Sequence, residues 1–186
     1  MAELSAQEQL LIELVNRARL DPAGEAARFG VGLNSGVPAN QVISSAAKQP
    51  LAGNELLGDA AGAHSLFMLD NDKFEHQGIG DGTPQSRMAD AGYVFTGSFM
   101  SGENIAIVGT TGAVNLTTST VDMHENLFLS VGHRINMLLG GYRELGTGVE
   151  SGNFPFLVDH DGNAATPKQM MMFNAVDATE NFATSG

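Results

Sequence analysis

The chain has 186 residues, enough for one domain with a substantial core, and its 21 acidic against 9 basic residues give a formal charge of -12. So acidic a chain is a poor ligand for nucleic-acid phosphates, and the absence of cysteine excludes disulfides, thiolate nucleophiles and cysteine-bound zinc. No apolar run approaches the roughly 18 residues of a membrane span, so no transmembrane segment is expected, and no signal peptide is visible.

Helical patterns dominate the first third of the sequence. Ser5 and Glu8 form a capping box that predicts a helix ending at Asp21-Pro22, and a second short helix is expected over residues 23–29. Residues 30–50 are rich in glycine, proline, asparagine and serine without periodicity, which indicates a long surface connection.

A third helix should begin after Asn54 and end near residues 70–73. His64 lies on its apolar stripe, where a buried histidine with a hydrogen-bonded ring is favoured over a ligand. His76 follows on a glycine-rich loop, a kind of segment that often displays functional side chains.

The middle of the chain starts with a predicted helix from Thr83-Pro84 to Ala91, followed by a short extended piece at residues 93–95. Glu103 lies in the segment Gly102-Glu103-Asn104, which we interpret as a turn before an apolar stretch at residues 105–108.

A further helix is predicted over residues 117–129. His124 and Glu125 share a face with apolar residues there, so this face should be buried or line a cleft. Gly132 is expected to break the helix, with His133 opening a second short helix beyond it.

The last third of the chain favours strands. We expect strands at residues 145–150, 154–159 and 169–176, a hairpin turn at residues 160–163, and a final strand or linker at residues 181–186. Helices first and strands last predict an α+β fold, with helices packed on a small antiparallel sheet in a single domain over residues 1–186.

The candidate site residues are His76, Glu103, Glu125 and His133. Two imidazoles and two carboxylates are the groups that a divalent metal site or a general acid and base pair requires. The alternative is a purely structural polar network that ties loops to the core.

Several segments in this order resemble the CAP superfamily, which contains cysteine-rich secretory proteins, insect venom antigens, plant pathogenesis-related proteins and bacterial SCP-domain proteins. In having no cysteine, the chain resembles the bacterial branch of this superfamily. The matching segments span most of the chain: Leu14-Val15-Asn16-Arg17-Ala18-Arg19, residues 60–68, Phe74-Glu75-His76, residues 87–93, Gly102-Glu103-Asn104-Ile105-Ala106, Gly132-His133-Arg134 and Leu145-Gly146-Thr147-Gly148-Val149.

The resemblance implies an α-β-α sandwich with a cleft of two histidines and two glutamates that binds zinc or another divalent ion in some members. His76, Glu103 and His133 match three of the four positions. Members with disulfides carry the fourth, a glutamate, just after a helix tryptophan. Here Leu127 stands in the tryptophan place and Glu125 precedes it, so Glu125 would have to reach the cleft from the preceding turn.

The resemblance further implies a secreted binding or interaction module, with a small ligand, a lipid or a cell-surface molecule as its partner. A metal-dependent peptidase or esterase, with Glu103 and Glu125 as catalytic carboxylates and His76 and His133 as metal ligands, is an alternative. A sterol or fatty-acid carrier is another. Two imidazoles are one ligand short of the usual catalytic zinc set, so we expect weak metal binding without turnover.

Overall fold

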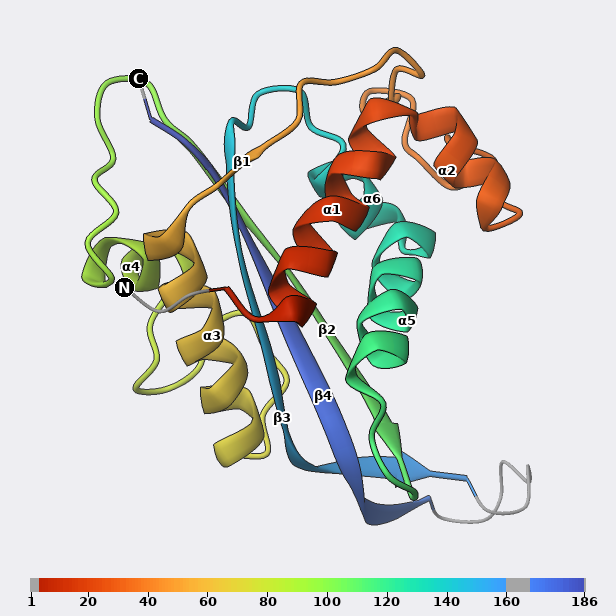
Figure 1. The fold of residues 1–186 in the computed structure, drawn as a ribbon, viewed down its shortest axis with the longest axis vertical. Coiled ribbons are helices and arrows are strands. Elements are labelled where there is room, and N and C mark those ends of the chain that lie inside the picture. Colours follow the sequence, from red (N-terminus) through yellow and green to blue (C-terminus); the bar gives the residue numbers. More distant parts are fainter. Residues whose placement is uncertain (1–3, 160–167, 186) are drawn as a thin grey trace.

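The computed structural model describes residues 4–159 and 168–185. This part of the chain forms helices α1 (Ala6–Leu20), α2 (Pro22–Arg28), α3 (Glu55–Asp70), α4 (Pro84–Asp90), α5 (Leu116–Leu129) and α6 (Val131–Met137). Its strands are β1 (Ala52–Gly53), β2 (Met100–Thr110), β3 (Glu144–Val158) and β4 (Gln169–Thr184), and Figure 1 shows their arrangement. None of the helices in these ranges is long and apolar enough to cross a bilayer.

The strands form one sheet in the order β1-β3-β4-β2. β4 is antiparallel to both β2 and β3, whereas the two-residue strand β1 pairs with β3 in parallel. This confirms the predicted α+β class, with the difference that the sheet is mixed.

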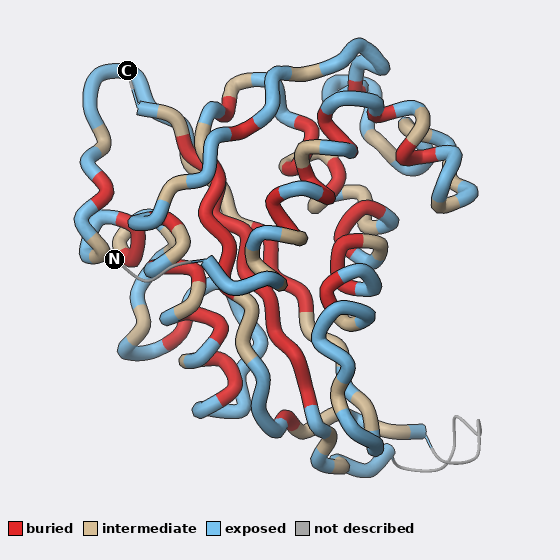
Figure 2. The backbone as a smooth tube through the Cα atoms, viewed as in Figure 1, coloured by how far each residue is buried: buried red, intermediate tan, exposed pale blue. Residues whose placement is uncertain are grey.

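Helices cover both faces of the sheet, so the fold has three layers. α3 and α4 lie on one side of the long strands, and α1, α2, α5 and α6 lie on the other (Figure 1). The larger hydrophobic core fills the second interface and includes Leu11, Met123, Phe128, Leu145 and Phe182. The buried residues therefore concentrate along the middle of the strands (Figure 2).

Close approach of α3 to the sheet depends on two glycines of β3. A Cβ atom on Gly146 would fall on the backbone of Leu57 and Gly58, and one on Gly148 on the backbone of Ala61 and Gly62. Only glycine leaves the space for such backbone contact between a helix and a strand.

Two predicted strand boundaries are wrong. Residues 145–150 and 154–158 belong to one continuous strand, β3, which ends one residue before the predicted boundary, and β4 extends from the predicted third strand to Thr184. β3 pairs with β4 along its whole length, and these backbone hydrogen bonds keep the chain extended even at the glycines of β3. The expected turn at residues 160–163 lies outside the described residues.

Three local predictions are also corrected. Glu103 lies within strand β2 and not in a turn, and residues 93–95 form no strand. The break between α5 and α6 falls at Ser130, whose backbone is extended, whereas Gly132 is the second residue of α6. Gly102 does not form a turn. It allows close packing, because a Cβ atom there would clash with the side chains of Tyr142 and Asn136.

Candidate functional site

The site is built around the carboxylate of Glu103. In the β2–β4 register Glu103 stands opposite Asn181, whose side chain donates to the carbonyl of Leu57 in α3, so the two side chains share the α3 face of the sheet. The Glu103 side chain is only 1% exposed. A carboxylate removed from water to this degree requires charged or hydrogen-bonding partners.

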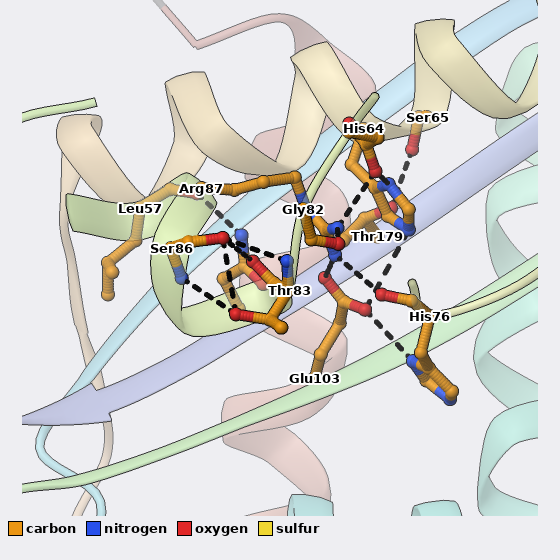
Figure 3. A network of polar contacts seen from close by, with 12 residues as sticks. Leu57, His64, Ser65, His76, Gly82, Thr83, Ser86, Arg87, Glu103 and Thr179 are labelled. Atoms are coloured by element: carbon orange, nitrogen blue, oxygen red, sulfur yellow. Dashed lines mark hydrogen bonds and ion pairs between the residues drawn. The ribbon is translucent and has the colours of Figure 1, made fainter. Parts of the chain in front are cut away.

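Arg87 of α4 supplies the cation. Its Nη2 lies 2.6 Å from Glu103 Oε2 and also donates to the backbone carbonyl of His76 at 3.2 Å, while Nη1 lies 2.8 Å from Asp81 Oδ2. The guanidinium therefore joins two carboxylates and fixes the loop that carries His76. Figure 3 shows this side chain reaching from α4 toward Glu103.

His64 of α3 is fully buried beside the same carboxylates. Its Nδ1 lies 2.7 Å from Asp81 Oδ2, and its Nε2 lies 3.8 Å from Glu103 Oε1. Burial lowers the pKa of His64 more strongly than the nearby Glu103 raises it. The prediction of a buried histidine with a hydrogen-bonded ring is confirmed. His64 lies beside Glu103 and binds Asp81, which is also bound to Arg87.

His76 is the exposed member of the group. Its Nδ1 lies 2.9 Å from Glu103 Oε1, and its side chain is 50% exposed. A carboxylate that accepts from one ring nitrogen fixes the tautomer and directs the other nitrogen outward, as is usual for histidines that bind metals. Nε2 of His76 is therefore the atom positioned to meet a ligand.

His133 is the third residue of α6. Its backbone carbonyl accepts a hydrogen bond of 3.3 Å from the side chain of Asn104, the neighbour of Glu103 in β2. Burial lowers the pKa of His133, and the His76 imidazole lowers it further. The structure thus places His76, Glu103 and His133 in one neighbourhood at β2, with both imidazoles within electrostatic reach of each other.

A buried network holds α6 against β2 behind these residues. Asn104 donates to Glu180 of β4 at 2.9 Å, Asn136 donates to Asn104 at 3.0 Å, and Tyr142 donates to Asn136 at 2.7 Å. Asn136 also donates to the carbonyl of Glu103 at 3.2 Å. The position of His133 relative to Glu103 therefore depends on the buried side chains of Asn104, Glu180 and Tyr142 and on the partly buried Asn136.

Glu125 does not join this group. It lies on α5 and lines a groove with Ile107, Gly109 and Phe156, and none of His76, Glu103 and His133 lines that groove. The adjacent His124 is fully buried, and its Nε2 lies 2.8 Å from Glu25 Oε1 of α2, so it ties helices together on the opposite side of the sheet.

Arg87 and Asp81 have no predicted role from the sequence, although both contact the site. Arg87 lies in one of the segments that resemble the CAP superfamily, and it is one of only 9 basic residues in the chain. Its buried ion pairs could not be read from the sequence, because Arg19 and Arg134, which are also buried, bind backbone carbonyls and not carboxylates.

The donor set at this site fits a metal ion weakly. The described residues contain no group of three histidine, aspartate or glutamate side chains arranged to hold one. Both oxygens of Glu103 are already engaged, by His76 and by Arg87. Two imidazoles remain, which suits an ion that keeps most of its water ligands.

Comparison with known proteins concerns the fold. No protein-family model matches the sequence, and no curated protein matches it. In structure, the chain is similar to an extracellular protein containing an SCP domain from Bacillus anthracis, with 20% sequence identity over 98% of this chain and a TM-score of 0.55. The match covers 44% of that protein, so this chain spans less than half its length.

A second similar structure is an outer surface protein from Borrelia burgdorferi. It shares 11% identity, with 100% of this chain and 97% of the other covered and a TM-score of 0.52. The first of these structures shows that the chain has an SCP-like fold.

Proposed function

We propose that the chain is a CAP-type module of a secreted or surface-exposed bacterial protein that binds a ligand without chemical turnover, and that its site holds a divalent ion such as zinc weakly. The SCP-like fold, shared with an extracellular and an outer surface protein, supports this location. The site observation that supports it most is the engagement of Glu103 by both His76 and Arg87.

In this proposal Nε2 of His76 and the imidazole of His133 are the metal ligands. Glu103 orients His76 through Nδ1, and the ion pair with Arg87 holds the Glu103 side chain in place. The lowered pKa of His133 favours the neutral imidazole, the form that binds metals. A bound ion would supply an attachment point for an oxygen or nitrogen atom of a ligand.

Zinc titration followed by thermal unfolding tests the proposal. We expect zinc to raise the melting temperature of the unaltered protein, because an ion that binds only the folded state stabilises it. His133→Ala and His76→Ala should each abolish the rise, whereas Glu125→Gln should retain it. A melting temperature that does not change when zinc is added would contradict the metal site. So would a zinc-induced rise in melting temperature that persists in His133→Ala.

A metal-dependent hydrolase is the weaker candidate. A general base needs a carboxylate oxygen that water can reach, and the Glu103 side chain is only 1% exposed and is bonded to Arg87 and His76. Glu125, the other carboxylate considered, lines a separate groove. Hydrolysis of peptide or ester substrates that needs zinc and is lost in Glu103→Gln would establish this candidate instead.

A fatty-acid or sterol carrier is favoured by one observation. An apolar groove of about 330 Å³ runs between residues 41–48 and α6, with Ile43, Ile135 and Leu138 in its lining and Lys48 beside them. An ammonium group next to an apolar groove suits a fatty-acid carboxylate better than an uncharged sterol. Fatty acid that co-purifies with the protein and is lost in Leu138→Asp would support this role.

A further inference from the structure

We propose that the groove between α5 and the C-terminal end of β2 binds a small organic cation of the ammonium type. The groove has a volume of about 560 Å³. This lies within the range typical of sites for small molecules. It is separate from the site around Glu103, because none of His76, Glu103 and His133 lines it.

Its carboxylates supply the charge complementarity. Asp122 and Glu125 of α5 line the groove, and its lining contains no basic residue. Neither carboxylate forms an ion pair within residues 4–159 and 168–185. On a chain of charge -12 this edge of the molecule attracts cations.

Aromatic rings supply the second requirement. Phe156 and Phe173, both partly exposed, line the groove and pack edge to face with ring centroids 5.3 Å apart. Phe154 extends the row, 5.4 Å from Phe156. A ring face attracts an ammonium ion that has methyl groups or an alkyl chain, because such an ion gives up little water on contact with apolar surface.

Backbone packing fixes the rings relative to β2. A Cβ atom on Gly109 would lie 2.5 Å from the Phe156 ring and 3.1 Å from Cβ of Phe173, so glycine lets both residues lie close to the strand. β2 is the last strand of the sheet as described, with β4 as its neighbour, so this side of the groove is not covered by a further strand. Aromatic rings and carboxylates thus meet in one open groove.

Choline is a suitable probe, with 3,3-dimethyl-1-butanol as its uncharged counterpart of the same shape. We expect ligand-observed NMR and calorimetric titration to detect choline binding and to find the alcohol at least about tenfold weaker. Glu125→Gln and Asp122→Asn should each weaken choline binding several-fold, and Phe156→Leu should do the same. Zinc should not compete, which separates this groove from the site at Glu103.

Glu55→Gln and Asp59→Asn serve as matched controls, because they remove the same charge from α3, outside this groove. Choline affinity should be unchanged in both. Equal affinity for choline and the alcohol would overturn the proposal. So would an equal loss in Glu55→Gln and Glu125→Gln, since that shows attraction by overall charge alone. The acidic variants change surface positions of a helix, so the test stands even if Phe156→Leu fails to fold.

Discussion

Arg87 is the residue on which the site most depends. Its guanidinium lies between Glu103 and Asp81, two carboxylates with little access to water, and it also holds the carbonyl of His76. Without this cation two like charges would face each other in a poorly solvated place. The site therefore requires at position 87 a side chain that is positively charged and can also bind both carboxylates.

Arg87→Ala should lower the free energy of unfolding by about 3–5 kcal/mol, because it leaves buried carboxylates without a counter-ion. Arg87→Lys should recover only part of the loss, since one ammonium group cannot span both carboxylates as a planar guanidinium does. Urea unfolding measures both values. The control is Arg28→Ala, which removes an exposed partner of Glu25 and should cost less than about 1 kcal/mol. Equal losses in the two alanine variants would contradict this role for Arg87.

Glu25 shows how a buried charge can stabilise helix packing at a single residue. Burial alone would raise its pKa, but hydrogen bonds from His124 and Arg17 outweigh burial and lower it to about 2. A carboxyl group whose pKa is lower in the folded protein stabilises the fold above its unfolded pKa and loses that contribution as the pH falls.

Glu25→Gln should therefore flatten the acid limb of the stability curve. In the unaltered protein the contribution of Glu25, about 3 kcal/mol, should disappear between about pH 5 and pH 2. The variant should be less stable at neutral pH and should lose less on acidification. Urea unfolding across this range provides the measurement, and parallel acid limbs in the two proteins would show that Glu25 is not responsible.

At the scale of elements, α3 and β3 pack by backbone contact. Gly148→Ala places a Cβ atom on the backbone of Ala61 and Gly62, so α3 must move and stability should fall by about 3 kcal/mol. Gly62→Ala is the matched control from the same contact, because its Cβ atom would meet only Glu150 Oε1 at 3.6 Å. That substitution should stabilise α3 by about 0.5–1 kcal/mol. Thermal unfolding should separate the two variants, and a harmless Gly148→Ala would disprove the close contact.

The sequence predicts the helices well because their end signals are local. The Ser5 capping box and the Asn54 cap are both present in the structure. Strand boundaries depend on distant partners, so the union of two predicted strands in β3 could not be inferred from residues 144–158 alone. For the same reason the sequence predicts a turn at Glu103, although its pairing with Asn181 puts it inside β2.

The candidate site could be predicted only in part from the sequence. The resemblance to the CAP superfamily selected His76, Glu103 and His133, which the fold places in one neighbourhood. The sequence favours Glu125 only because it is the nearest acid to the tryptophan position, whereas the side chains that engage Glu103 include Arg87 of α4. Two residues 16 positions apart cannot be paired from periodicity, because a loop of irregular structure separates their elements.

At the scale of the whole molecule, β4 places acidic side chains in the middle layer. Asp177 and Glu180 are both fully buried residues of this central strand. Burial raises the pKa of Asp177 to about 8, with Ser65 opposing and Glu103 reinforcing the rise, and burial raises the pKa of Glu180 to about 7 against the hydrogen bond from Asn104. The folded protein therefore keeps protons on β4 that the unfolded chain releases above about pH 4.

Because the pKa values of both carboxyl groups are higher in the folded state, stability should fall as the pH rises from about 4 through 8. Glu180→Gln mimics the protonated form and can still accept the hydrogen bond from Asn104, so it should remove the part of the decline due to this group, on the order of 3 kcal/mol. Asp177→Asn should remove a further part. Urea unfolding across this pH range measures the slopes, with Glu55→Gln on the surface of α3 as the unaffected control. A decline as steep in Glu180→Gln as in the unaltered protein would show that Glu180 is ionised throughout, and the network that holds α6 and His133 against β2 would then contain a buried charge.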